Sequence, residues 1–355
     1  MKLVDLFSGC GGFSLGAHRA GFSVPLAFDL DPILTSSYNY NFPSSKLVLT
    51  DIAKLSGAEI KKMIGSEVGG IFGGPPCQGF SSIGRREFDD PRRKLLFHFF
   101  RLVSEIMPPF FIMENVVGLS YEDAKFELDS AIGIVAKDYN ILGPLIMDAS
   151  DFGAATRRRR LFVIGIASEF SDAISTQDID ELRMPAQNVH SAISDLAGAK
   201  FVGDDEGFDI WRIKDRIKFG PYASNLRNRE GIFSGNRKTV HAEHVIKRFS
   251  EVIPGGTDTI GRHVRLRWEG QCPTLRAGTG SDRGSFQSVR PLHPEEPRVI
   301  TVREAARLQG FPDLFRFHPT IWHSFRMIGN SVSPVQSQAL FVALRRKFEA
   351  AGHVI

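Results

Sequence analysis

The sequence predicts an α/β protein whose mainly parallel sheet carries helices on both faces, together with a second, smaller and irregular domain. Three observations support this fold class. Short apolar runs alternate with helical segments over residues 1–166, a glycine-rich turn follows the first run, and the alternation is lost from about 168 to 291. A chain of 355 residues with 42% hydrophobic content can bury one large or two moderate cores.

The first elements form a strand, a helix and a second strand. Residues 3–7 indicate a buried strand, and the glycine turn after it leads into a helix that ends near Ala20. Residues 23–28 indicate the next strand. Asp29 follows it, twenty residues after Gly9, the spacing at which an acidic residue reaches ribose hydroxyls in nucleotide-binding folds. An adenosine-containing ligand is therefore implied.

Later segments continue the alternation of strands and helices. We expect strands at 46–49, 68–72, 110–113, 141–147 and 161–166, and a helix over 95–106. Thr301 and Glu304 form a capping box that predicts a helix start, and an apolar stripe predicts a final helix over 334–350. The expected first domain covers residues 1–170 and is completed by 292–355, and the second domain covers 171–291.

Positive charge is concentrated in the middle of the chain. The net charge is +4, but residues 211–290 contain sixteen Lys or Arg against seven Asp or Glu, so the remainder carries −5. Aromatic residues are interspersed with these cations: Trp211, Phe219, Tyr222, Phe233, Phe249, Trp268 and Phe286. This composition is typical of a nucleic-acid surface, although a solvated basic face would look the same.

Composition argues against several protein classes. No apolar run reaches the roughly 20 residues of a membrane-spanning helix, and a strand pattern that begins at once leaves no room for a signal peptide. The three cysteines are odd in number and widely spaced, which argues against a disulfide framework or a zinc cluster. His241 and His244 have no cysteine pair nearby. We expect a monomer that stays in the cytoplasm and binds no metal.

One cysteine lies in a rigid loop. The loop Gly73-Gly74-Pro75-Pro76-Cys77-Gln78-Gly79-Phe80-Ser81 follows an apolar run. Prolines fix φ and lack an N–H, while glycines permit close approach of a substrate, so the Cys77 thiol is held in place as a nucleophile would be. Single cysteines are also common packing groups. Cys10 and Cys272 have no plausible acid partner, and we expect both to be structural.

Further motifs distinguish between these readings of Cys77. The chain opens with Asp5-Leu6-Phe7-Ser8-Gly9-Cys10-Gly11-Gly12-Phe13-Ser14-Leu15-Gly16, and later carries Glu114-Asn115-Val116, Arg157 to Arg160, and Ile328-Gly329-Asn330-Ser331-Val332. Together with the Pro-Pro-Cys loop, in this order, they resemble the cytosine-5 DNA methyltransferases of bacterial restriction-modification systems. The resemblance covers roughly residues 1–166 and 290–355. It implies a Rossmann-like sheet for S-adenosylmethionine and a middle domain, 171–291, that recognises the target.

The resemblance also implies the cofactor site. The glycine turn would hold the methionine part of S-adenosylmethionine, Phe7 would lie against the adenine, and Asp29 would accept hydrogen bonds from the ribose. The full implied set, which would also hold the product S-adenosylhomocysteine, is Phe7, Ser8, Gly9, Cys10, Gly11, Gly12, Asp29, Leu30, Asp51, Ile52, Pro76, Leu95, Asn330, Ser331 and Val332. Asp29 is shorter than the glutamate usual in the family, and Leu30 replaces a frequent aromatic residue.

The chemistry follows from the difficulty of methylating carbon 5 of cytosine, which is a poor nucleophile until a group adds to carbon 6. A thiolate suits that addition, and we assign it to Cys77. Glu114 follows an apolar strand that would raise its carboxyl pKa, so it could donate a proton toward ring nitrogen 3. By resemblance, Arg158 and Arg160 would hold the cytosine carbonyl and the surroundings of the nucleophile. Thr156 stands where a glutamine is common.

A cytosine inside a duplex is out of reach of such a pocket, so the base must be flipped out. The loop after the nucleophile, with Ser81, Arg85 and Arg86, suits DNA phosphates, and Arg92, Arg93 and Lys94 could add to it. Thr274-Leu275 resembles a Thr-Leu element of the family's recognition domain. Double-stranded DNA is the expected partner, with a cognate restriction endonuclease acting separately as a further candidate.

Three alternative functions are compatible with parts of the sequence. The same chemistry on transfer RNA is the nearest, and the long basic middle domain favours DNA over it. A catalytically silent DNA-binding accessory protein is opposed by the retention of Cys77, Glu114 and the glycine turn. An NAD-dependent dehydrogenase is opposed by the glycine spacing, which is Gly9, Gly11, Gly12 and then Gly16.

Overall fold

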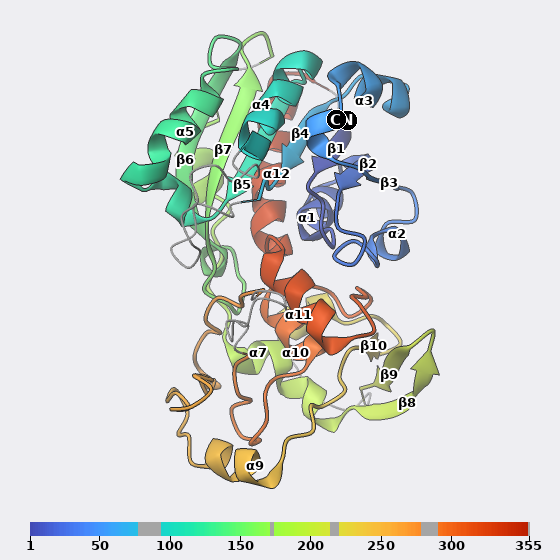
Figure 1. The fold of residues 1–355 in the computed structure, drawn as a ribbon, viewed down its shortest axis with the longest axis vertical. Coiled ribbons are helices and arrows are strands. Elements are labelled where there is room, and N and C mark those ends of the chain that lie inside the picture. The colour runs from blue at the N-terminus through green and yellow to red at the C-terminus, as the bar shows by residue number, and fades with distance from the viewer. Residues whose placement is uncertain (77–93, 171–173, 214–219, 278–289, 354–355) are drawn as a thin grey trace. The chain divides into compact units, whose positions relative to one another are not determined.

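The computed structural model describes residues 1–76, 94–170, 174–213, 220–277 and 290–353 (Figure 1). Its contacts divide the chain into two compact units. The first unit is Met1–Asp148, Arg159–Arg183 and Gln336–Ile355, and the second is Ala149–Arg158 and Met184–Val335. In the part of the chain that is described, no helix is both long and apolar enough to span a membrane.

A seven-stranded sheet forms the centre of the first unit, in the order β3-β2-β1-β4-β5-β7-β6. Its strands are β1 (Lys2–Leu6), β2 (Ser23–Asp29), β3 (Lys46–Leu49), β4 (Gly70–Gly73), β5 (Phe110–Asn115), β6 (Tyr139–Asp148) and β7 (Arg159–Ala167). Each corresponds to a strand expected from the sequence. Of these seven strands, β7 alone runs in the direction opposite to the others, and it pairs antiparallel with both β5 and β6. The predicted mainly parallel α/β sheet is confirmed.

Helices cover both faces of this sheet, as predicted (Figure 1). The helices of the first unit are α1 (Gly12–Arg19), α2 (Tyr38–Asn41), α3 (Gly57–Ile64), α4 (Lys94–Ile106), α5 (Glu122–Ile132), α6 (Thr176–Asp180) and most of α12 (Pro334–Ala350), with the short turns η1 (Ile52–Lys54) and η3 (Val117–Ser120). Adjacent residues of β5 show the two layers. Phe110 packs against Phe348 of α12, and Phe111 packs against Phe99 and Phe100 of α4, because successive strand residues point to opposite faces.

The helix α1 is fixed closely against its neighbours, which positions the glycine turn before it. A Cβ at Gly16 would lie 1.9 Å from the Oγ of Ser337 on α12, so only glycine permits this packing. On the sheet side, the Ser14 hydroxyl donates to the buried Asp5 carboxylate of β1 at 2.5 Å and contacts the Tyr38 hydroxyl at 2.8 Å. Burial raises the pKa of Asp5 well above its usual value.

The second unit contains more regular structure than the sequence suggested. Its elements are η4 (Ala149–Asp151), α7 (Val189–Ile193), η5 (Ser194–Gly198), β8 (Lys200–Asp205), β9 (Phe208–Arg212), α8 (Pro221–Leu226), β10 (Ile232–Ser234), α9 (Glu243–Ser250), α10 (Val302–Leu308) and α11 (Ile321–Asn330). The strands form an antiparallel sheet in the order β10-β9-β8. Because β8 is exposed along most of its length, it lacks the apolar alternation by which a strand is recognised.

The contacts place residues 292–335 in the second unit, whereas the sequence analysis grouped 292–355 with the first. A buried ion-pair cluster accounts for this. The Arg307 guanidinium of α10, which is fully buried, pairs with Asp195 at 2.7 Å and with Asp313 at 2.7 Å. Asp195 is 112 positions from Arg307, so no local pattern relates these two residues.

Replacing Asp195 with alanine is expected to lower the free energy of unfolding by about 3 to 5 kcal/mol, because the buried Arg307 charge loses one partner. Urea unfolding measures the change. Asp180→Ala is the matched control, since Asp180 and Arg183 form an ion pair at 2.7 Å that is about half exposed, and its loss is expected to cost less than about 1 kcal/mol. Equal effects of the two substitutions would contradict a stabilising role for the buried cluster.

Candidate active site

The glycine turn after β1 has the strained backbone of a ligand-binding loop. Phe7, Gly9 and Gly11 all have left-handed φ angles, of 66°, 52° and 92°. Such a conformation is rare for a residue with a side chain, and at Phe7 it is maintained only because the surrounding structure imposes it. A Cβ at Gly9 would meet nothing within 4 Å. The turn therefore leaves open space before α1, where backbone N–H groups favour an anionic group.

Asp29 braces this turn. Its Oδ2 accepts a hydrogen bond from the Gly9 N–H at 2.8 Å, and its Oδ1 accepts from the N–H groups of Leu30 and Asp31 at 2.7 and 2.9 Å. Burial raises the pKa of Asp29, while these three hydrogen bonds act in the opposite direction. The carboxylate predicted to bind ribose thus also fixes the glycine turn, a role that the spacing alone did not reveal.

The other expected cofactor residues of the first unit lie around the same sheet edge. Ser8 is buried, and its Oγ has no hydrogen-bond partner among the described residues. Asp51 caps η1 by accepting from the Ala53 N–H at 3.0 Å, and Ile52 beside it is buried. Leu30 is 68% exposed, which leaves its side chain available to a ligand. Cys10, Gly11 and Gly12 are buried, whereas Phe7, Pro76 and Leu95 are partly buried.

Glu114 lies directly against the Pro-Pro-Cys loop. A Cβ at Gly74 would lie 2.7 Å from the Glu114 Oε2, so a larger residue there would displace the carboxyl group. Asn115 donates from Nδ2 to the Pro75 carbonyl at 3.1 Å, which braces the loop. Glu114 is also paired with Arg160, whose Nε lies 2.9 Å from Oε1 in a nearly buried contact.

The strand order explains this pairing. Glu114 lies opposite Phe162 in the register of β5 and β7, and Arg160 precedes Phe162 by two residues, on the same face. Because β7 is antiparallel to β5, its first residues lie at the edge where β5 ends. Arg158 differs from Arg160: it is fully buried and donates to the carbonyls of Leu275 at 3.1 Å and Gly329 at 2.8 Å.

Comparison with known proteins gives the family. The family model described as "C-5 cytosine-specific DNA methylase" matches residues 1–346. The chain belongs to this family. It is therefore a methyltransferase acting on carbon 5 of cytosine, and the predicted family and activity are confirmed.

The methylase is similar to several proteins along its whole length. The Type II methyltransferase M.XorII of Xanthomonas oryzae pv. oryzae is 36% identical, with 99% of this chain and 87% of the relative covered. M.DdeI of Desulfomicrobium norvegicum is 31% identical, with coverages of 98% and 89%. A prophage-encoded DNA modification methyltransferase of E. coli has 40% identity and a TM-score of 0.84 over 98% of this chain and 99% of that one. The S. pombe Dnmt2 methyltransferase shares the fold, at 18% identity and a TM-score of 0.63.

Several expected residues of the methylase lie outside the described residues. They are the nucleophile Cys77 and the proposed DNA contacts Ser81, Arg85 and Arg86, together with Arg92 and Arg93. Thr274 is described, and its hydroxyl donates to the Arg157 carbonyl at 2.7 Å. In the second unit, Val332 is buried, Ser331 is partly buried and Asn330 is exposed. The roles of all these residues stay predictions.

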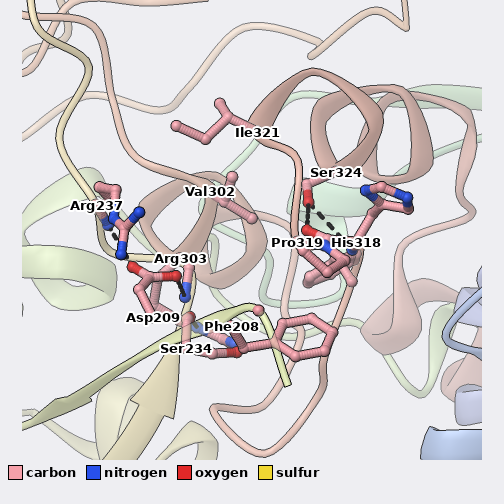
Figure 2. Close-up of a pocket in the computed structure, with 13 residues that line it drawn as sticks. Phe208, Asp209, Ser234, Arg237, Val302, Arg303, His318, Pro319, Ile321 and Ser324 are labelled. Atoms are coloured by element: carbon pink, nitrogen blue, oxygen red, sulfur yellow. Dashed lines mark hydrogen bonds between the residues drawn. The ribbon is translucent and has the colours of Figure 1, made fainter. Parts of the chain in front are cut away.

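The second unit of the methylase also has a small pocket beside β9 (Figure 2). Asp209 lines it, but its carboxylate is already engaged by the N–H groups of Gly235 and Arg237 and by the indole of Trp211. The buried Arg303 guanidinium donates to three backbone carbonyls. None of the site residues expected from the sequence lines this pocket.

The described part of the chain contains no candidate metal-binding cluster. No group of three or more His, Cys, Asp or Glu residues there could hold a metal ion. His241 accepts a hydrogen bond at Nε2 from the Val299 N–H at 3.4 Å and stacks edge-on against Phe249. The sequence analysis did not predict the buried hydrogen bond between Asp5 and Ser14, because the only sequence signal was an acidic residue inside an apolar strand.

Cys272 is expected to resist alkylation in the folded methylase. Its side chain is fully buried, and burial raises the pKa of the thiol to about 12, so little thiolate forms at about pH 8. Treatment with iodoacetamide followed by peptide mass spectrometry should show unmodified Cys272 in the native protein and modified Cys272 in urea. The buried Cys10 is the internal comparison. Labelling of native Cys272 at the rate of a free thiol would contradict the prediction.

Proposed function

We propose that this methylase transfers a methyl group from S-adenosylmethionine to carbon 5 of a flipped-out cytosine in a specific duplex DNA sequence, through a covalent adduct with Cys77. One observation carries the assignment of residues. The Glu114 carboxylate pairs with Arg160, and its Oε2 lies 2.7 Å from where a Cβ on Gly74 of the Pro-Pro-Cys loop would be. Gly74 is three residues before Cys77, so the expected acid lies beside the loop that carries the expected nucleophile.

In the proposed reaction the Cys77 thiolate adds to carbon 6 of the cytosine. The electron pair of the 5,6 double bond moves into the ring, and carbon 5 becomes nucleophilic. S-adenosylmethionine, when bound, supplies an electrophilic methyl group. Carbon 5 takes up that group, a base or water then removes the carbon-5 proton, and the sulfur–carbon bond breaks, which restores the double bond and frees the thiolate.

Glu114 would donate its carboxyl proton toward ring nitrogen 3, where negative charge develops during the addition, and would take the proton back before the methylated base is released. Its two oxygens have different surroundings: Oε1 pairs with the Arg160 Nε, and Oε2 faces Gly74. We assign Oε1 to the pairing with Arg160. The guanidinium would hold the carboxyl in a single orientation, and its remaining N–H groups would approach the cytosine carbonyl.

The glycine turn and Asp29 fit S-adenosylmethionine. Among the described residues the turn has open space at Gly9, and the buried Ser8 hydroxyl, which has no partner there, can serve a ligand. The N-terminus of α1 favours the carboxylate of the methionine part. Asp29 retains acceptor capacity for ribose hydroxyls beside its three N–H donors, since each carboxylate oxygen accepts more than one bond. Asn330, Ser331 and Val332 of the second unit stay predicted cofactor contacts.

The second unit would recognise the DNA sequence. Its support is the excess of positive charge in residues 211–290 together with relatives that are named Type II methyltransferases. Part of that charge is internal, since Arg265 is buried and donates to the carbonyls of Phe249 and His293. Ser81, Arg85, Arg86 and Thr274 would contact the DNA. A cognate restriction endonuclease would act separately on the same sequence, and the methylase would act as a monomer in the cytoplasm.

The test of this function is covalent trapping. Incubation with S-adenosylmethionine and duplex DNA carrying 5-fluorocytosine should give a complex that survives denaturing electrophoresis, because fluorine at carbon 5 blocks the elimination. Cys77→Ser should abolish both the complex and methylation. Transfer of tritiated methyl groups to transfer RNA but not to duplex DNA would instead support the RNA alternative, and an active Cys77→Ser variant would refute the mechanism.

Replacing Arg160 with alanine is expected to lower kcat by a factor of about 10² to 10³, because the Glu114 carboxyl loses its fixed orientation and the site loses a charged donor. Binding of S-adenosylhomocysteine, measured by calorimetry, should be unchanged. Arg159→Ala is the matched control, since Arg159 is the adjacent arginine and is exposed. An equal loss of kcat in both variants would indicate a general charge effect on DNA binding.

A further inference from the structure

Arg158 connects two segments within the second unit through hydrogen bonds to their backbone carbonyls. Its side chain is fully buried, so it is not available to a substrate in this arrangement. Nη1 donates to the Leu275 carbonyl at 3.1 Å, and Nη2 donates to the Gly329 carbonyl at 2.8 Å. One rigid guanidinium thus joins two segments that are more than fifty residues apart in the chain.

The first of these segments is also paired along its backbone with the residues before Arg158. The Cys272 N–H donates to the Ala155 carbonyl at 2.9 Å, and the Arg157 N–H donates to the Cys272 carbonyl at 2.9 Å. The Thr156 hydroxyl donates to the same Cys272 carbonyl at 3.1 Å. Residues 271–277 are therefore held in register before the chain reaches residue 278.

The second segment approaches the first very closely. A Cβ at Gly329 would lie 2.4 Å from the Ala277 nitrogen and 2.6 Å from the Arg276 carbonyl carbon, both backbone atoms, so only glycine fits. Gln309 holds the other side of this segment: its Nε2 donates to the Ile328 carbonyl at 2.8 Å, and its own carbonyl accepts from the Ser333 hydroxyl at 2.8 Å. The loop 329–332 is fixed between Arg158 and Gln309.

We propose that Arg158 is a positioning residue through which DNA binding by 271–277 and cofactor binding by 330–332 strengthen each other. The inference rests on the proposed function, which assigns Thr274 to DNA and Asn330, Ser331 and Val332 to S-adenosylmethionine. Leaving a buried guanidinium without acceptors costs free energy. When the Leu275 carbonyl is in place to accept from Arg158, the Gly329 carbonyl is therefore also more stable in its own position, and the reverse holds. A ligand that fixes one segment thereby reduces the cost of ordering the other, and the coupling is reciprocal.

Calorimetry measures this coupling directly. S-adenosylhomocysteine is titrated into the full-length protein, with and without a short duplex that contains the site found by bisulfite sequencing of DNA from expressing cells. In the natural protein the duplex is expected to tighten S-adenosylhomocysteine binding about 5- to 150-fold. In Arg158→Gln this factor should fall to within about twofold of one, whereas the affinity for S-adenosylhomocysteine alone should change much less.

Two further variants keep the test decisive if Arg158→Gln does not fold. Gly329→Ala pushes the two segments apart while leaving the Arg158 side chain itself unchanged, and it should reduce the coupling factor. Arg158→Lys keeps the charge but not the fork of donors, and should restore only part of the factor. Arg157→Ala is the control, because it removes a neighbouring arginine whose Nε contacts the Gln271 side chain at 2.9 Å near the surface. Its coupling factor should equal that of the natural protein.

The outcomes separate this inference from the proposed function. If S-adenosylhomocysteine does not bind the natural protein at all, the proposed cofactor site is wrong. If it binds and the duplex binds, but neither affects the other, the function stands and the role of Arg158 is refuted. A coupling factor in folded Arg158→Gln and Gly329→Ala equal to the natural one would also refute it.

Discussion

Antiparallel pairing of β7 with β5 is the constraint on which the candidate site depends. The parallel strands of the first unit all end at one edge of the sheet, where ligands bind in open α/β folds. A parallel seventh strand would carry its first residues to the opposite edge. Because β7 is reversed, Arg160 at its start lies diagonally across from Glu114 at the end of β5, and their side chains form a nearly buried ion pair.

Close backbone approach sets the remaining geometry of this edge. A Cβ at Gly73 would lie 2.0 Å from the Leu6 carbonyl oxygen, and one at Gly74 would meet the Glu114 carboxylate. Glycines therefore allow β4 to lie against β1 and the Pro-Pro-Cys loop to lie against the acid. The same principle holds the loop at Gly329 against residues 276 and 277 in the second unit. Larger side chains would separate the groups that must act together.

Buried arginines organise the second unit. Arg158, Arg303 and Arg307 are all fully buried, and each directs its donors to backbone carbonyls or to carboxylates from distant segments. Burial lowers the pKa of Arg303 to about 10, whereas the carboxylates beside Arg307 raise its pKa. Each arginine fixes the relative position of segments with little regular structure of their own. Arg265, within the basic stretch 211–290, is also buried and donates to backbone carbonyls, so part of the charge that composition suggested for a DNA-binding surface is architectural.

The sequence by itself determined the seven strands of the central sheet, the capping box at Thr301, the family, and Asp29 at the end of β2, because each depends on local periodicity or a short motif. It did not reveal the strands β8 to β10, which lack apolar alternation, or the grouping of 292–335 with the second unit. Only the tertiary structure showed that Arg160 meets Glu114 while Arg158 turns into the interior. Two arginines in one short run have nearly the same local signal, and their different partners lie up to 171 residues away.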